Sequence, residues 1–201
     1  MKRRPRIGLD FDGTIADTAQ VKHDWLIENR DLAVPLSSCS RSGLCARGIE
    51  PEEYDQMLSA VCGRESTLAT PECEGAIDGV LALASFADLF LITDRGRHEE
   101  WLRWGQEWLQ DKGIWDLFQG ALSTEYSPLT KSREKSKAQL CQENGTHVLV
   151  DDDRENLVGL SDTVGVPYAR GGVADSKCDP EPQQASSWSE VVALCRAMFL
   201  S

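Results

Sequence analysis

Three short apolar runs that end at polar side chains constrain the fold of this 201-residue chain most strongly. The runs are residues 6–9 before Asp10, residues 89–92 before Thr93, and residues 147–150 before Asp151. Apolar residues at consecutive positions are typical of strands that helices cover on both faces. The runs therefore predict buried parallel strands whose carboxyl ends lie at one edge of a sheet.

Helical patterns separate these strands. In residues 97–112 the spacing of Trp101, Trp104 and Trp108 predicts a helix with an aromatic face toward the core. Alternating strands and helices predict an α/β fold, a Rossmann-like doubly wound parallel sheet with right-handed crossovers. The other expected helices are residues 76–86, 132–143 and 188–200, and weaker strand patterns cover residues 120–123 and 164–168.

A long segment after the first strand interrupts the alternation. Helical patterns at residues 16–30 and 51–62 flank a polar stretch, residues 35–48, that we expect to be a loop. We predict a small helical cap, residues 17–75, inserted after the first strand of a core domain made of residues 1–16 and 76–201. A Pro- and Ser-rich stretch, residues 171–187, is expected to be a surface connection.

Composition excludes several classes of function. With 33 acidic and 21 basic residues, the net charge of −12 argues against binding of a nucleic-acid polymer. The longest charge-free apolar stretch, residues 79–87, is far shorter than the ~20 residues of a membrane span. Seven scattered cysteines without a C-x-x-C pair predict reduced thiols rather than disulfides or zinc. We therefore expect a cytoplasmic protein with no membrane partner and no signal peptide.

Carboxylates dominate the ends of the predicted strands. Ligands of parallel α/β sheets bind at the carboxyl ends of the strands, so these side chains should converge despite their separation in sequence. Several carboxylates in one pocket repel one another unless a cation is bound, and all-oxygen ligation favours Mg²⁺. A metal among aspartates suggests a phosphoryl group as the reacting part of a substrate. The converging residues are Asp10, Asp12, Thr93, Asp151 and Asp152.

The spacing of Asp10 and Asp12 suits two-step phosphoryl chemistry. Residues i and i+2 of a strand point the same way, so both carboxylates should face one pocket. One carboxylate can attack phosphorus, and the other can move the proton of the leaving group. Gly13 and Thr14 then let the chain turn sharply beside the substrate.

The ordered motifs resemble those of the haloacid dehalogenase (HAD) superfamily. They are Asp10-Phe11-Asp12-Gly13-Thr14-Ile15, Thr93 after a strand, a lysine before a helix, and Asp151-Asp152 after another strand. The resemblance covers essentially the whole chain, and residues 17–75 resemble the helical C1-type cap of that superfamily.

The resemblance implies a role for each motif residue. Asp10 would be the nucleophile and a Mg²⁺ ligand, and Asp12 the general acid/base with its backbone carbonyl on the metal. Thr93 would bind phosphoryl oxygens, and Asp151 would ligate Mg²⁺ with Asp152 in support. Because the true dehalogenases of the superfamily lack the second aspartate, Asp12 favours phosphate chemistry.

The catalytic lysine is open among three residues, Lys131, Lys135 and Lys137. All three precede or open the helix before the third strand. Lys137 fits the family register best, and the others would then belong to a solvated helix face. The chemistry requires a cation that stabilises both Asp10 and the phosphoryl charge.

Further residues have weaker support. Asp94 and Arg95 are expected substrate-binding residues, and Arg95, Arg97 and His98 either reach a second anionic group or form a solvated helix start. Asn156 either orients Asp152 by a hydrogen bond or caps its own helix. In the cap, Arg41 and Arg47 flank a loop that could close over substrate.

The expected activity is Mg²⁺-dependent hydrolysis of a small soluble phosphate monoester. A further similarity, to the 5'(3')-deoxyribonucleotidase-type branch, adds nucleotides to the candidates; it includes Asp151-Asp152-x-x-x-Asn156 and Trp188-Ser189-Glu190-Val191. The alternatives are a phosphotransferase or mutase with the same aspartyl-phosphate, and a non-catalytic regulatory protein of the same fold.

Overall fold

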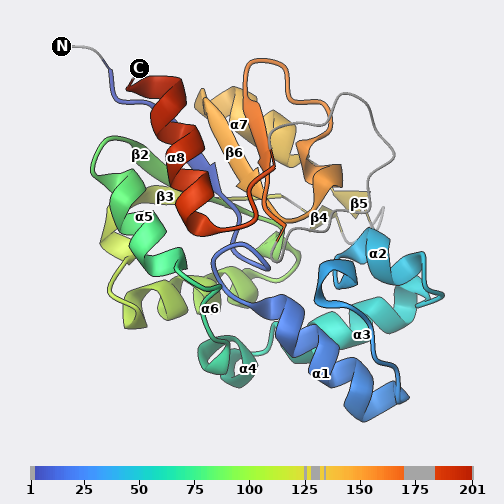
Figure 1. Ribbon diagram of the computed structural model, residues 1–201. Coiled ribbons are helices and arrows are strands. Elements are labelled where there is room, and N and C mark those ends of the chain that lie inside the picture. The colour runs from blue at the N-terminus through green and yellow to red at the C-terminus, as the bar shows by residue number, and fades with distance from the viewer. Residues whose placement is uncertain (1–2, 125, 128–131, 134, 170–183, 201) are drawn as a thin grey trace.

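A parallel sheet forms the centre of the molecule (Figure 1). The computed structural model describes residues 3–124, 126–127, 132–133, 135–169 and 184–200. Within this part of the chain, the five strands of the sheet lie in the order β3-β2-β1-β6-β7, all parallel. The predicted α/β architecture is therefore confirmed. The strands are β1 (Arg6–Leu9), β2 (Asp88–Thr93), β3 (Phe118–Ser123), β6 (Val148–Asp151) and β7 (Val164–Pro167).

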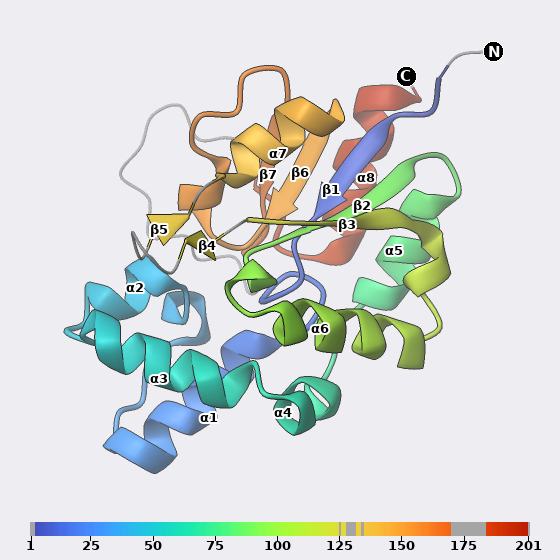
Figure 2. The same cartoon turned by 180° about the vertical axis from the view of Figure 1, so that it is seen from behind.

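Helices pack against both faces of the sheet (Figures 1 and 2). The helices α5 (Ala76–Ala84), α6 (Glu99–Asp111) and α8 (Trp188–Phe199) share the larger hydrophobic core with the strands. Helix α7 (Lys137–Asn144) forms a smaller cluster on the other face. Short 3₁₀ turns join these elements, namely η1 (Leu36–Ser38), η2 (Arg95–Arg97), η3 (Trp115–Leu117) and η4 (Arg154–Leu157).

The alternation of side chains in β1 shows why residues 7–9 of the central strand carry no polar side chain. Ile7 and Leu9 are fully buried in the larger core, so Gly8 faces α7 on the opposite side of the sheet. A Cβ atom at Gly8 would lie 2.5 Å from Cδ1 of Ile92. Glycine therefore allows the smaller cluster to pack directly on the strand that ends at Asp10.

The segment between β1 and α5 forms a group of helices with its own apolar core (Figure 1). Buried residues of this core include Leu26, Leu44 and Met57. This helical segment contributes side chains to a cavity that it shares with the carboxyl ends of the strands. Its helices are α1 (Thr18–Arg30), α2 (Arg41–Cys45), α3 (Pro51–Val61) and α4 (Arg64–Ala69).

Three local predictions were wrong. Residues 35–48 contain η1 and α2, which are too short for a hydrophobic period to reveal, and α4 was not predicted. The helix expected at residues 132–143 begins only at Lys137, because Ser136 and Gln139 form a reciprocal capping box. Before it, β4 (Tyr126–Ser127) and β5 (Ser132–Arg133) pair as a small antiparallel ribbon.

Two expectations concern other parts of the chain. Most of the predicted connection at residues 171–187 lies outside the described residues. No helix in the part of the chain that the structure describes combines the length and the apolar character needed to cross a membrane.

Candidate active site

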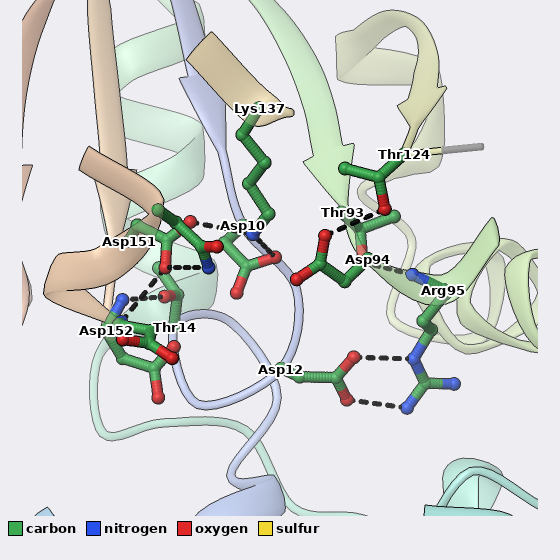
Figure 3. A network of polar contacts seen from close by, with 12 residues as sticks. Asp10, Asp12, Thr14, Thr93, Asp94, Arg95, Thr124, Lys137, Asp151 and Asp152 are labelled. Carbon is green, nitrogen blue, oxygen red and sulfur yellow. Dashed lines mark hydrogen bonds and ion pairs between the residues drawn. The ribbon is translucent and has the colours of Figure 1, made fainter. Parts of the chain in front are cut away.

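Three neighbouring strands bring the predicted motif residues together (Figure 3). Leu9 of β1 pairs with Leu91 of β2 on one side and with Val150 of β6 on the other. The backbone N–H of Asp10 donates to the Val150 carbonyl at 3.0 Å, which continues the ladder past the last residue of β1. This register places Asp10 between the carboxyl ends of its two neighbours.

Asp10, Asp151 and Asp152 form a cluster that could hold a metal ion. Each offers a carboxylate oxygen, and these oxygens lie within 4.8 Å of one another. Asp10 and Asp151 are buried, and Asp152 is partly buried. Burial and the repulsion of neighbouring carboxylates raise the pKa of Asp10 well above its ordinary value. Burial, together with the charge of Asp151, raises the pKa of Asp152 to about 8.

Lys137 provides the cation beside the nucleophile candidate. Its Nζ atom lies 2.7 Å from Oδ1 of Asp10 and 2.7 Å from Oδ2 of Asp151. The side chain is 1% exposed, and the two carboxylates keep its pKa high despite the cost of burial. Lys135, in contrast, pairs with Glu143 at 2.9 Å on the outer face of the protein. Lys131 lies outside the described residues, so the geometry favours Lys137 over Lys135.

Asp12 is held by a two-pronged ion pair rather than by the acidic cluster. Nε and Nη2 of Arg95 donate to its two carboxylate oxygens at 2.8 and 2.7 Å. Burial acts to raise the pKa of Asp12, but the Arg95 guanidinium outweighs it and leaves the pKa below its ordinary value. The resting state of Asp12 is therefore the ionised one.

The sequence left open whether Arg95 reaches an anionic group or belongs to a solvated helix start. The structure rules out the solvated helix start for Arg95. Its side chain is 2% exposed. The guanidinium lies 4.5 Å from the centre of the Phe11 ring and donates to Oγ1 of Thr67 in α4 at 3.0 Å. These contacts commit the side chain to Asp12 and its surroundings. His98 is exposed, with its ring 4.4 Å from that of Trp101, whereas the side chain of Arg97 is outside the described part of the structure.

The turn after Asp12 positions the acidic cluster. Oγ1 of Thr14 accepts a hydrogen bond from the backbone N–H of Asp152 at 3.1 Å. Gly13 has a φ of 79°, and a Cβ atom there would lie 2.2 Å from Oδ2 of Asp152. Glycine is therefore required at this position by both backbone conformation and space. Contact of Gly13 and Thr14 with substrate stays a prediction.

Thr93 and Asp94 lie at the end of β2 (Figure 3). Thr93 is fully buried, and its Oγ1 accepts a hydrogen bond from the backbone N–H of Arg95 at 3.3 Å. The carboxylate of Asp94 accepts from Oγ1 of Thr124 at 2.8 Å. Both side chains are thus fixed at the carboxyl edge of the sheet by neighbours on η2 and at the end of β3.

Asn156 supports a different aspartate from the one expected. Its Nδ2 atom donates to Oδ1 of Asp151 at 3.0 Å. The backbone N–H of Asp153 donates to the same Asp151 oxygen at 2.9 Å. Asp151 therefore receives support from Lys137 on one oxygen and from the η4 turn on the other.

The helical segment adds residues that the sequence analysis missed. Lys22, Tyr54 and Cys62 line a cavity of about 90 Å³ together with Asp10 and the other acidic residues. Arg41 lines it too, as expected of that loop, but Arg47 is not among its lining residues. The one available signal for Lys22 was its position between Thr18 and Leu26, four residues from each on one helix face.

The tryptophans of α6 lie in two different environments, the hydrophobic core and the cavity. Trp108 is fully buried in the core, where its ring meets Phe11 edge-on at 5.4 Å. Trp101, about two turns earlier in the helix, lines the cavity beside Arg95. The prediction of a core face is confirmed for Trp108, whereas Trp101 belongs also to the candidate site.

No family model and no curated protein matches the chain. Solved structures do. A haloacid dehalogenase-like hydrolase from Streptococcus pneumoniae, SP0104, has 16% identity and a TM-score of 0.64 over 96% of this chain and 98% of that one. A predicted phosphatase from Clostridium acetobutylicum has 12% identity and a TM-score of 0.68 over 98% and 100%. This chain has the HAD fold.

Other proteins with the HAD fold differ in the ligands they carry. The HAD-hydrolase YfnB from Bacillus subtilis, crystallised with magnesium, has 12% identity and a TM-score of 0.58 over 96% of this chain and 99% of that one. An L-2-haloacid dehalogenase from Xanthobacter autotrophicus, with chloropropionic acid covalently bound, has 11% identity and a TM-score of 0.58 over 98% and 100%. At these identities the likeness defines the fold, and the activity depends on the residues of the site.

Proposed function

We propose that the protein is a Mg²⁺-dependent hydrolase of small phosphate monoesters, with nucleotides among the candidate substrates. The observation that carries the proposal is the position of Asp10, whose carboxylate lies 2.7 Å from the Lys137 ammonium within a cluster of three aspartates. This arrangement supplies a buried nucleophile, a cation beside it and a donor set for a divalent ion.

The donor set fits Mg²⁺. Three carboxylates with oxygens within 4.8 Å match the preference of Mg²⁺ for a few oxygen ligands, with the remaining positions left to water or substrate. Burial and the charges of neighbouring carboxylates raise the pKa values of Asp10 and Asp152, so a cation bound beside them would favour their ionised forms. Asp10, Asp151 and Asp152 would hold the ion, with the backbone carbonyl of Asp12. When bound, Mg²⁺ would neutralise negative charge on the phosphoryl oxygens.

In the first half of the proposed reaction, a carboxylate oxygen of Asp10 attacks phosphorus. The new bond joins Asp10 to phosphorus, and the bond from phosphorus to the alcohol oxygen breaks. Lys137 orients Asp10 and stabilises charge on the phosphoryl group, and Thr93 would donate its hydroxyl to a phosphoryl oxygen. A proton from Asp12 goes to the departing alcohol.

In the second half, water attacks phosphorus and the bond to Asp10 breaks, which releases phosphate. Asp12 accepts a proton from that water, which replaces the proton that it gave to the departing alcohol. Since Arg95 favours ionised Asp12, proton donation requires at least one of the two Arg95 hydrogen bonds to open. The two Arg95 hydrogen bonds favour the ionised form of Asp12, which is the form that accepts a proton from water in the second half.

The helices α1–α4 are proposed to act as the cap of this site. Their side chains form part of the wall of the cavity that Asp10 and Asp152 also line, where a cap would limit the access of water. Exclusion of water strengthens the electrostatic interactions on which the reaction depends.

Asp12 also favours phosphate chemistry over the dehalogenation that the names of two structural neighbours indicate. A dehalogenase releases a halide, which needs no proton, so a partly buried Asp12 with its own cation would not be needed to protonate the leaving group. The phosphate reaction uses this carboxylate twice.

The direct test is hydrolysis of p-nitrophenyl phosphate by the full chain with Mg²⁺, with Ca²⁺ and with neither. We expect turnover with Mg²⁺ and inhibition by Ca²⁺, which prefers more ligands and a looser geometry. Sugar acceptors in the same assay would reveal transfer, and 2-chloropropionate would reveal dehalogenation. Halide release without phosphatase activity would contradict the proposal.

A further inference from the structure

Lys22 is a buried lysine outside the catalytic motifs. It lies on the inner face of α1, is 8% exposed, and lines the cavity with Asp10 and Asp12. Lysine is almost never buried without a partner, because removing its ammonium from water is costly. Its placement therefore requires an explanation that helix packing does not supply.

The other two buried cations in the part of the chain that the structure describes, Lys137 and Arg95, already have carboxylate partners. Lys137 lies 2.7 Å from both Asp10 and Asp151, and Arg95 holds Asp12 with two hydrogen bonds. Among the described residues, no carboxylate oxygen lies within 4.0 Å of the Lys22 ammonium. Lys22 is thus a cation of the cavity that no single acidic residue neutralises.

The side chain of Lys22 nevertheless stays protonated in the folded protein. Burial acts to lower its pKa, but Tyr54, Asp152 and Asp12 act together to raise it above the ordinary value. The ammonium is therefore charged at neutral pH, on a side chain that lines the cavity with Tyr54 of α3 and Asp152.

A second cation lies on the same wall. Arg41, the first residue of α2, lines the cavity, and its guanidinium carbon lies 5.5 Å from the centre of the Tyr54 ring. The ring restricts where the guanidinium can lie. Lys22 and Arg41 thus place two positive charges on the helical side of the cavity that Asp10 also lines.

The cavity is small. Its volume is about 90 Å³, and side chains of the acidic cluster and of the helical segment line it together. A phosphoryl group at Asp10 would therefore place the alcohol part of the substrate near the helical side chains.

We propose that Lys22 and Arg41 form a subsite for a second anionic group, a carboxylate or a phosphate, on the alcohol part of the substrate. The preferred substrates are then small phosphate monoesters with two anionic ends. This inference rests on the proposed function, because the subsite selects among substrates of the same Asp10 chemistry.

Matched esters test the subsite in the wild-type protein. Phosphoglycolate and ethyl phosphate differ in having a carboxylate or a methyl group at the same position, and propane-1,3-diol bisphosphate and propyl phosphate make the corresponding phosphate pair. We expect kcat/KM to be about 10- to 100-fold higher for at least one anionic member than for its neutral partner, the range for hydrogen bonds to charged groups. The pair with the larger ratio identifies the anion.

The variant Lys22→Met keeps the aliphatic stem and removes the charge. We expect it to reduce that ratio of kcat/KM about 10-fold or more, whereas Lys22→Arg retains most of it. Lys135→Met is the matched control, because Lys135 pairs with Glu143 away from the cavity.

Two results would overturn the inference: wild-type ratios near one for both pairs, or a ratio unchanged in folded Lys22→Met. If ethyl and propyl phosphate are hydrolysed as efficiently as the esters with a second anionic group, the subsite is contradicted but the proposed function is not. Absence of hydrolysis of all four esters and of p-nitrophenyl phosphate contradicts the proposed function itself.

Discussion

At the scale of single residues, the charge of Asp12 is set by one guanidinium. Arg95→Lys keeps a positive charge but loses the planar pair of donors. We predict that the pKa of Asp12 rises in this variant, because the Arg95 hydrogen bonds and charge lower it in the native protein. The ¹³C shift of the Asp12 carboxyl, followed against pH and assigned with Asp12→Asn, measures the change. Arg103→Gln, an exposed site on α6, is the control, and an unchanged or lower pKa in Arg95→Lys would contradict the account.

The nucleophile gives the sharpest prediction for activity. Asp10→Asn removes the attacking charge while keeping the shape of the side chain. We expect kcat for p-nitrophenyl phosphate to fall about 10⁴-fold or more, the size seen when a nucleophile is removed. Asp116→Asn, at an exposed position in η3, is the control. Single-turnover phosphate release by Asp10→Asn at the native rate would show that another group attacks phosphorus.

The sequence could predict which carboxylates lie together, but it could not predict all of their hydrogen-bond and ion-pair partners. Asp10 and Asp151 follow neighbouring parallel strands, so strand order alone brings them together. The pairing of Arg95 with Asp12 depends on the path of η2 and on Thr67 of α4, which a strand pattern does not encode. Lys22 was missed for a similar reason, because only tertiary packing places that face of α1 over the site.

At the scale of elements, the start of α7 determines where Lys137 lies. Lys137 is the first residue of the helix, directly after the cap formed by Ser136 and Gln139. Ser136→Ala should cost about 1 kcal/mol of stability, the usual effect of losing a helix cap, and should also lower kcat because the Lys137 ammonium becomes less well positioned.

The matched control for this element is Ser187→Ala. Ser187 caps α8, which carries none of the candidate catalytic side chains. We expect a similar loss of stability in denaturant unfolding with little change in kcat. If both variants lost activity equally, general destabilisation would explain the effect and the α7 cap would have no special role.

The predicted elements were most accurate where the apolar runs were long or clearly ended. The strands that end just before Asp10, at Thr93 and at Asp151 are present, and Gly145 ends α7 in the left-handed conformation, as an Asn-Gly pair suggests. The five residues of α2 and the ribbon before α7 were missed, because pairs or single turns of residues give no periodic signal.

At the scale of the whole molecule, the acidic cluster links stability to pH and metal. The folded-state pKa of Asp152 is about 8, and that of Asp10 is also raised, so folding takes up protons at pH values where unfolded carboxylates are ionised. The free energy of unfolding of the metal-free protein should therefore increase as the pH falls from above 8 toward 5. The contribution of the Asp12–Arg95 pair is lost only at lower pH, because the pKa of Asp12 is depressed.

Calorimetry at several pH values checks this linkage. We expect Mg²⁺ to raise Tm more at pH 8.5 than at pH 6, because binding requires ionised carboxylates. Asp152→Asn should weaken the pH dependence of Tm in the metal-free protein. This variant distinguishes the effect of the acidic cluster from the effect of the overall net charge. A metal-free Tm that increases with pH across this range would contradict the account.

The most direct test of the whole account is detection of phosphate on the protein itself. Asp12→Asn, which slows attack by water, is mixed with Mg²⁺ and p-nitrophenyl phosphate, quenched in acid and analysed by peptide mass spectrometry. We predict a phosphoryl adduct on the peptide that contains Asp10, and its absence in the Asp10→Asn/Asp12→Asn double variant. An active wild-type protein that yields no adduct on Asp10 in any quenched sample, or one on a different residue, would contradict the central claim.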